Sequence, residues 1–236
     1  MTDKITVKNL HVNYGNLTVL DGFDAIFEKG KINVILGGSG VGKSTLIGAI
    51  AGIVEHTGDI EGIDGGISLI FQKDRLISSI SVYKNLDLVL KGVFKDKEER
   101  KNRIEEMLKI LEIEDCRDKS PREISGGQAQ RVCLARAFLY PSEVILMDEP
   151  FKALDTALRH RLLEWLFRLD QLTPKTIILV THAIDECLLA ADKFMVLGGK
   201  PATVVLEGEI ATDKRERKLT DDNLTEVRKR LLESIN

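Results

Sequence analysis

The chain has 236 residues, of which 43% are hydrophobic and 30% are charged, a globular composition that excludes disordered and fibrous proteins. Its 34 lysines and arginines nearly balance 37 aspartates and glutamates, giving a net charge of −3, which argues against nucleic-acid binding through bulk charge. Three isolated cysteines and the lack of a long apolar stretch predict reduced thiols in the cytosol, without a disulfide framework, signal peptide or membrane span.

The first part of the chain contains three predicted strands and a helix. Residues 4–12 alternate between apolar and polar side chains, as in a half-buried strand, and residues 23–27 form a second apolar stretch before a turn. A continuously apolar run over 32–36 then leads into a glycine-rich loop, after which a helix is expected over 43–51.

A later part of the chain again alternates buried strand and helix. Residues 144–147 and 176–180 are short apolar runs, typical of strands that are buried on both faces of a parallel sheet. Between them, apolar side chains recur at helical spacing over 158–169. This order of strand, helix and strand predicts a doubly wound α/β fold.

Two segments differ from this pattern. Residues 76–140 are rich in helix signals and charge and contain no obvious buried strand, which predicts a helical subdomain inserted into a single domain 1–236, between core segments 1–75 and 141–236. Residues 221–235 form an amphipathic pattern. We expect this terminal helix to pack on its own domain, with docking to a partner as the alternative.

A phosphate-binding loop follows the third strand. The motif G-x-x-x-x-G-K-[ST] is matched at every fixed position by Gly37, Gly38, Ser39, Gly40, Val41, Gly42, Lys43 and Ser44, and Thr45 follows. The glycines let successive backbone N–H groups converge on phosphate oxygens, and the helix that begins there adds its positive dipole end. Lys43 would reach the β- and γ-phosphates, and Ser44 would ligate Mg²⁺. The loop predicts nucleotide binding but leaves kinases, GTPases and ATPases open.

Ionisable side chains follow both later strands. Asp148 and Glu149 come directly after residues 144–147. An aspartate at this position can hold Mg²⁺ through water, and Glu149 can polarise an attacking water as a general base. His182 follows residues 176–180, at the end of a strand, where α/β sheets gather ligands. Its imidazole could donate a hydrogen bond to a γ-phosphate oxygen.

The segment Ile124-Ser125-Gly126-Gly127-Gln128 resembles the signature motif of the ATP-binding cassette (ABC) ATPases, with isoleucine in place of the usual leucine. Such a segment opens a helix whose outward N–H groups make a second anion-binding end. In the family, this end closes over the γ-phosphate that a second subunit holds. The resemblance implies a RecA-like P-loop NTPase fold, with a mostly parallel sheet, an N-terminal antiparallel β part and an inserted helical subdomain.

The same resemblance implies roles for residues elsewhere in the chain. Tyr14 is similar to the aromatic residue that stacks on adenine, and Gln72 to the glutamine that touches Mg²⁺ and the attacking water. Ala153-Leu154-Asp155 resembles the loop that crosses the dimer interface, and His182 resembles the switch histidine. Since these motifs follow one another in the family's order, the resemblance covers nearly the whole chain.

Finer features are similar to the importers of nitrate, sulfonates, taurine and pyrimidine-like vitamin precursors. Phe151 directly after Pro150 is one such feature. Two residues depart from the pattern, because Lys152 replaces a frequent glycine and Ala183 follows the histidine where aspartate is common. Because the chain stops soon after the cassette, we expect no appended regulatory domain.

The resemblance therefore implies an ATPase that uses ATP and Mg²⁺ as the subunit of a membrane importer. Its implied partners are integral-membrane permease subunits, a second copy of itself and, through the complex, an extracytoplasmic solute-binding protein, with no nucleic acid. Its implied place is the cytoplasmic face of the membrane. A soluble ABC ATPase, such as the iron–sulfur assembly type, is the alternative. The signature and the lack of an Asn-Lys-x-Asp element argue against a plain kinase or GTPase.

Overall fold

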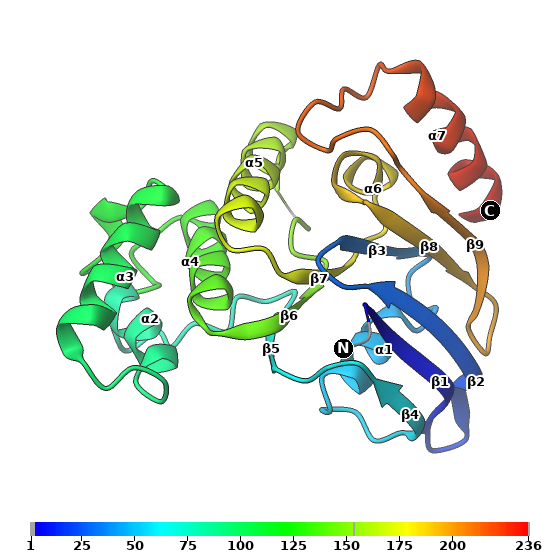
Figure 1. The fold of residues 1–236 in the computed structure, drawn as a ribbon, viewed down its shortest axis with the longest axis horizontal. Coiled ribbons are helices and arrows are strands. Elements are labelled where there is room, and N and C mark those ends of the chain that lie inside the picture. Colours follow the sequence, from blue (N-terminus) through cyan, green and yellow to red (C-terminus); the bar gives the residue numbers. More distant parts are fainter. Residues whose placement is uncertain (1–2, 153, 236) are drawn as a thin grey trace.

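The structure, a computed structural model, describes residues 3–152 and 154–235. Figure 1 shows the elements. In chain order they are β1 (Lys4–Tyr14), β2 (Leu17–Glu28), β3 (Ile32–Gly37), α1 (Lys43–Ile50), β4 (Thr57–Glu61), β5 (Gly66–Ile70), α2 (Val82–Leu90), α3 (Lys97–Ile110), the 3₁₀ turn η1 (Glu114–Cys116), α4 (Gly126–Leu139), β6 (Ser142–Asp148), α5 (Thr156–Leu172), β7 (Thr176–Val180), α6 (Ile184–Ala190), β8 (Lys193–Gly198), β9 (Thr203–Glu209) and α7 (Asp222–Ile235).

The strands form two sheets. The smaller sheet is antiparallel, with the order β2-β1-β4, and the larger has the order β5-β6-β7-β3-β8-β9. Strands β5, β6, β7, β3 and β8 are parallel, and β9 pairs antiparallel with β8 at one edge. This arrangement confirms the expected α/β fold, with its mostly parallel sheet and N-terminal antiparallel part. The four strands that the sequence analysis did not predict are β4, β5, β8 and β9.

The larger sheet is buried on both faces, as its apolar strands predicted. Along β3, Val34 and Leu36 join the core on the side of α4, α5 and α6, whereas Ile35 joins the core formed with the antiparallel sheet and α1. All three side chains have no exposed surface. Burial of each side chain stabilises the folded state by about 1.5–3 kcal/mol. Strand β3 therefore holds the start of the following loop in a fixed position.

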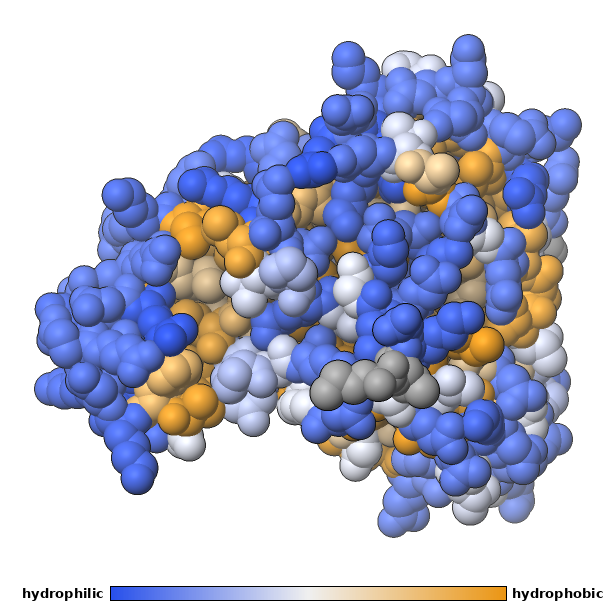
Figure 2. Space-filling model, viewed as in Figure 1, coloured by the Kyte–Doolittle hydropathy of each residue, from blue (hydrophilic) through white to orange (hydrophobic). Residues whose placement is uncertain are grey.

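Residues 76–140 lie to one side of the sheet. Helices α2 and α3 are at the far left of Figure 1, and α4 lies between them and the rest of the molecule. The buried Arg100 of α3 pairs with Asp87 of α2 at 2.7 Å and donates to the carbonyl of Phe94 in the turn between these helices. Most of the face in Figure 2 is hydrophilic. In the described part of the chain, no helix is long and apolar enough to cross a bilayer. The proposed subdomain boundaries stay a prediction.

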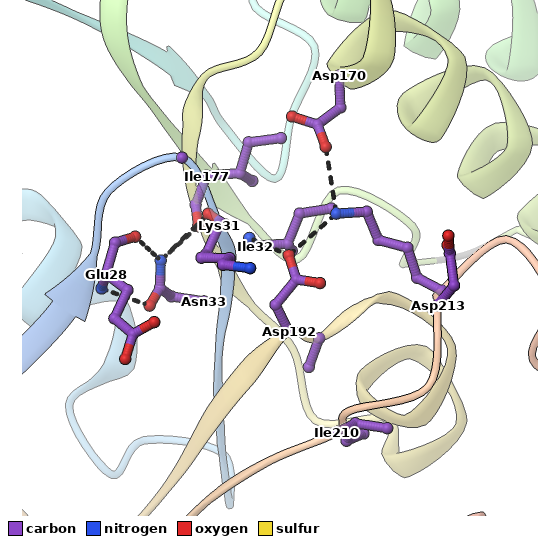
Figure 3. A network of polar contacts seen from close by, with 12 residues as sticks. Glu28, Lys31, Ile32, Asn33, Asp170, Ile177, Asp192, Ile210 and Asp213 are labelled. Atoms are coloured by element: carbon purple, nitrogen blue, oxygen red, sulfur yellow. Dashed lines mark hydrogen bonds and ion pairs between the residues drawn. The ribbon is translucent and has the colours of Figure 1, made fainter. Parts of the chain in front are cut away.

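A charged network holds the edge of the sheet where the parallel strands begin (Figure 3). Asp192 accepts a hydrogen bond from the Ile32 backbone at 2.8 Å and pairs with Lys214 at 2.9 Å. Lys214 also pairs with Asp170 of α5 at 3.2 Å. The side-chain amide of Asn33 donates to the Glu28 carbonyl at 2.9 Å. The network therefore joins both sheets, α5 and the C-terminal segment at the edge opposite the phosphate loop.

The C-terminal segment is anchored by Arg217, which is 7% exposed. Its guanidinium donates to the carbonyls of Leu188, Ala191 and Ile210 at 3.1, 2.7 and 2.9 Å. Beyond it, α7 packs on its own domain, as expected. Its predicted apolar face is confirmed, since its buried and partly buried residues on the core are Leu224, Val227, Leu231 and Ile235.

We predict that Arg217→Met lowers the free energy of unfolding by about 2–4 kcal/mol, because several buried carbonyl groups lose their donor. Urea unfolding followed by circular dichroism would measure the change. Arg215→Met is the matched control, since its side chain is 50% exposed and pairs with Asp213. We expect the control to change stability by less than about 0.5 kcal/mol. An equal loss in both variants would contradict the anchoring role of Arg217.

Candidate functional site

The candidate site lies where three neighbouring parallel strands end. Strand β3 leads into the loop 37–42, β6 ends at Asp148, and β7 ends just before Thr181 and His182. These strands are adjacent in the order β6-β7-β3. Parallel strands present their carboxyl ends at the same edge, which is where open α/β sheets bind ligands. The fold therefore brings the loop, the acidic pair and the histidine to one place.

The phosphate loop depends on glycine at two positions. Gly42 has a φ of 115°, and a Cβ there would lie 2.9 Å from the Val19 side chain. A Cβ on Gly37 would lie 2.6 Å from the Leu197 carbonyl oxygen. The helix that follows, α1, has no side-chain cap at Gly42. Its first N–H groups are therefore left for an anion, as the motif predicts.

Lys43 lies folded onto the loop. Its side chain is buried, and Nζ donates to the carbonyls of Gly37 at 2.7 Å and Gly38 at 2.9 Å. Burial lowers the pKa of Lys43, although the charges of Glu149 and Asp148 oppose this effect. The ammonium is thus placed at the loop by two carbonyl groups. Phosphate oxygens would be stronger, charge-assisted partners for it.

Asp148 and Ser44 supply neighbouring oxygen atoms. The Ser44 hydroxyl donates to Asp148 Oδ1 at 2.9 Å. Burial raises the pKa of Asp148, the bond from Ser44 opposes this rise, and the charge of Glu149 adds to it. A hydroxyl and a carboxylate are hard oxygen ligands that suit Mg²⁺, and two adjacent acidic groups favour a cation. The residues present therefore fit the expected metal.

Glu149 is held in an unusual backbone conformation at the centre of the site. Its φ is +46°, in the left-handed region that is rare for residues other than glycine. Its N–H donates to the Val180 carbonyl at 3.0 Å. The side chain meets Gln72 Nε2 at 3.2 Å and His182 Nδ1 at 3.2 Å. The three residues predicted to be catalytic therefore share one contact cluster.

A fourth residue, Lys152, joins this cluster. Its ammonium forms an ion pair with Glu149 Oε2, the oxygen that also accepts from Gln72. Burial works to raise the pKa of Glu149, but the bonds from Lys152 and His182 outweigh it and hold this pKa below its ordinary value. The sequence showed Lys152 only as a departure from the family pattern. The spacing of three residues between Lys152 and Glu149 was the one sequence feature that could have indicated this ion pair.

The signature segment lies apart from the chain's own loop. Ser125 caps α4, because its hydroxyl accepts from the Gln128 N–H at 3.3 Å while the Gln128 side chain accepts from the Ser125 N–H at 2.9 Å. Two N–H groups at the predicted anion-binding end, those of Ser125 and Gln128, are thus used within the motif. Gly127 packs against Leu158, and Ile124 packs partly buried on the core. Among the described residues, no hydrogen bond or ion pair joins 124–128 to 37–45.

The remaining predicted residues lie outside the Glu149 cluster. Tyr14, at the end of β1, is 51% exposed and so is accessible for stacking. Asp155 caps α5 by accepting from the Leu158 N–H at 2.9 Å. Ala153, in the predicted interface loop, is outside the described residues. The nucleotide and interface roles of these residues stay predictions.

Comparison with known proteins identifies a family. Residues 20–152 match the model of the ABC transporter family. The chain is 32% identical to an aliphatic sulfonates import ATP-binding protein of Xanthomonas axonopodis pv. citri, over 96% of this chain and 95% of that protein. It is 37% identical to an sn-glycerol-3-phosphate import ATP-binding protein of Rhizobium johnstonii, matching 83% of this chain but only 56% of that longer protein.

Solved structures agree with this fold. One is part of an ABC transporter complex from Clostridium perfringens, with 28% identity, a TM-score of 0.79 and coverage of 97% of this chain and 98% of that one. Another is a dimeric ATP-binding cassette in a post-hydrolysis state with ADP and phosphate, with 27% identity, a TM-score of 0.76 and coverage of 89% and 100%.

We predict that Lys152→Met raises the pKa of the Glu149 carboxyl group, because the variant removes the cation that favours its ionised form. An NMR titration of glutamate side-chain carbons would measure this pKa, with the signal assigned by its loss in Glu149→Gln. Lys101→Met is the control, since Lys101 forms an exposed ion pair with Glu98. A Glu149 pKa that stays unchanged in Lys152→Met, or moves equally in the control, would contradict the pairing.

Proposed function

Because the chain belongs to the ABC transporter family, we propose that it is the ATP-hydrolysing subunit of a membrane importer. The observation that carries this proposal is the cluster at the sheet edge, where Glu149 meets Gln72 and His182 beside the phosphate loop. The import ATP-binding proteins among its relatives support the importer over the soluble, iron–sulfur type of ATPase.

In this proposal, the loop 37–45 binds the phosphates of ATP. Lys43 exchanges its carbonyl partners for phosphate oxygens, and the uncapped N–H groups of α1 add to their binding. Tyr14 would stack on the adenine. Ser44 and Asp148, with Gln72, would hold Mg²⁺, which neutralises developing charge on the phosphates when it is bound.

Hydrolysis would use Glu149 as the general base. Its lowered pKa keeps the carboxylate ionised at neutral pH, so it can accept a proton from the attacking water. Gln72 and His182 fix its orientation, and His182 would also donate to a γ-phosphate oxygen. Most of the catalytic effect would come from positioning and from electrostatic stabilisation of the phosphoryl group.

A second copy of the chain would complete each site. Among the residues that the structure describes, the segment 124–128 makes no hydrogen bond with its own loop, so two chains arranged head to tail would let each signature face the partner's γ-phosphate. This sandwich is two-fold symmetric and gives two equal sites. Its closure and reopening at the cytoplasmic face would drive permease subunits, which would receive solute from an extracytoplasmic binding protein.

We expect Glu149→Gln to bind ATP but to lose at least about 100-fold in turnover, because an amide cannot take the proton from water. The trapped nucleotide should hold two chains together, giving an ATP-dependent dimer in size-exclusion chromatography. The control is Glu164→Gln, an exposed glutamate on α5, which should keep normal turnover. Full activity in Glu149→Gln would assign the base role to another residue.

Mixing two inactive variants tests the composite site. Lys43→Ala should lose nucleotide-dependent thermal stabilisation. Ser125→Arg should bind ATP as a monomer but block closure, because a bulky cation would occupy the end of α4 that faces the partner. A heterodimer of the two would retain one intact composite site, so the mixture should recover partial ATPase activity. If heterodimers form and show no activity, the head-to-tail arrangement is wrong.

A further inference from the structure

A buried carboxylate lies beneath the turn that carries His182. Glu186, in the first turn of α6, is 4% exposed. Its Oε2 accepts a hydrogen bond from the Thr181 hydroxyl, and that hydroxyl accepts from the Ala183 N–H at 3.0 Å. The residues before and after His182 are therefore both tied to one carboxylate. A change in the position of Glu186 would move the turn and its imidazole.

The other oxygen of this carboxylate faces α5. Arg159 Nε lies 3.2 Å from Glu186 Oε1, and Arg159 Nη2 donates to the Leu154 carbonyl at 3.1 Å. Leu154 belongs to the loop that the family resemblance places at the dimer interface. One guanidinium thus bridges this loop and the carboxylate that supports the His182 turn.

The bridge is incompletely bonded. Among the described residues, Arg159 Nε is the only buried side-chain nitrogen or oxygen that lacks a hydrogen-bond partner. It is close enough to Glu186 for an ion pair but is not aligned for a hydrogen bond. A small rotation of the guanidinium would align it, and the same rotation would move its bond to Leu154. A change in the contact with Leu154 would therefore also change the contact with Glu186.

Electrostatics connect the same carboxylate to the site. Burial raises the pKa of Glu186, whereas the bond from Thr181 and the charges of Arg159 and His182 lower it, and the charge of Glu149 raises it. Buried ion pairs often add little net stability, and some are retained because they specify one arrangement. A positioning role accounts for the cost of burying the Glu186 carboxylate beside the partly exposed Arg159.

We propose that Arg159 and Glu186 form a positioning pair that transmits the state of the Leu154 loop to His182. This inference rests on the proposed function, in which a partner subunit meets that loop and His182 acts in hydrolysis. Contact with the partner would shift Leu154, realign the guanidinium on Glu186 and set the turn at His182. Both residues would act through His182, since Glu186 is tied to its turn through Thr181 and Arg159 pairs with Glu186.

Three variants remove different parts of the bridge. Arg159→Met removes the cation, Glu186→Gln keeps an acceptor for Thr181 but removes the charge, and Thr181→Val breaks the link to the turn while conserving volume. The control is Arg161→Met on the same helix, whose side chain is 59% exposed and pairs with Glu112. Each variant would first be checked for MgATP-dependent thermal stabilisation, which we expect to match wild type.

Steady-state kinetics should then separate positioning from binding. We expect each bridge variant to lower kcat by about five- to tenfold with KM within about twofold, and the Arg159→Met/Glu186→Gln double variant to be no slower than either single variant. Arg159→Lys keeps the charge but lacks the fork that reaches both partners, so it should restore activity only in part. Wild-type kcat in Arg159→Met, or multiplicative losses in the double variant, would overturn the proposal.

A measurement without turnover tests the bridge itself. The chain has four histidines, so the His182 imidazole signal can be assigned in an NMR spectrum by its loss in His182→Ala. This signal should move in Arg159→Met and Glu186→Gln and stay in place in Arg161→Met. An unmoved signal in Arg159→Met would overturn the pair even if activity fell. A wild-type chain that hydrolyses no ATP would instead overturn the proposed function, and the His182 signal would still decide the bridge.

Discussion

The parallel pairing of β6, β7 and β3 is the constraint on which the site depends. Because the three strands run in the same direction, Asp148, His182 and the loop before Lys43 emerge at one edge. Burial of both sheet faces stabilises the strands, since their apolar side chains pack into a hydrophobic core on each side. The charged network around Asp192 closes the opposite edge. The two edges of the larger sheet therefore differ: hydrogen bonds and ion pairs close one edge, and the candidate site lies at the other.

The N-termini of α1 and α4 differ in their capping. Helix α1 begins without a side-chain cap, whereas α4 begins with a reciprocal cap between Ser125 and Gln128. An uncapped end offers its N–H groups directly to an anion. A capped helix end keeps its conformation without a ligand. Such an end is suited to a surface that is already formed when a partner docks on it. The difference fits the proposed roles, in which α1 helps to bind the phosphates and α4 docks on a partner subunit.

Glu149 joins the other elements of the site. Its carboxylate receives Gln72 from the segment after β5, His182 from the end of β7 and Lys152 from its own turn. The ammonium of Lys152 and the hydrogen bond with His182 favour its charged form, against the effect of burial. The proposed bridge supports His182 separately, because Glu186 is tied to the His182 turn through Thr181.

Local sequence determined the contiguous parts of this protein. The phosphate loop, the buried strands β3, β6 and β7, the acidic pair and the family relationship follow from short runs, because their backbone geometry and burial depend on neighbouring residues. Strands β4 and β9 escaped prediction, since their side chains are exposed or only partly buried and β4 shows no apolar run. Only the tertiary structure placed Gln72 and His182, 77 and 33 residues from Glu149, on its carboxylate. Such contacts, like the pairing of Arg159 with Glu186, depend on strand order, which no local pattern encodes.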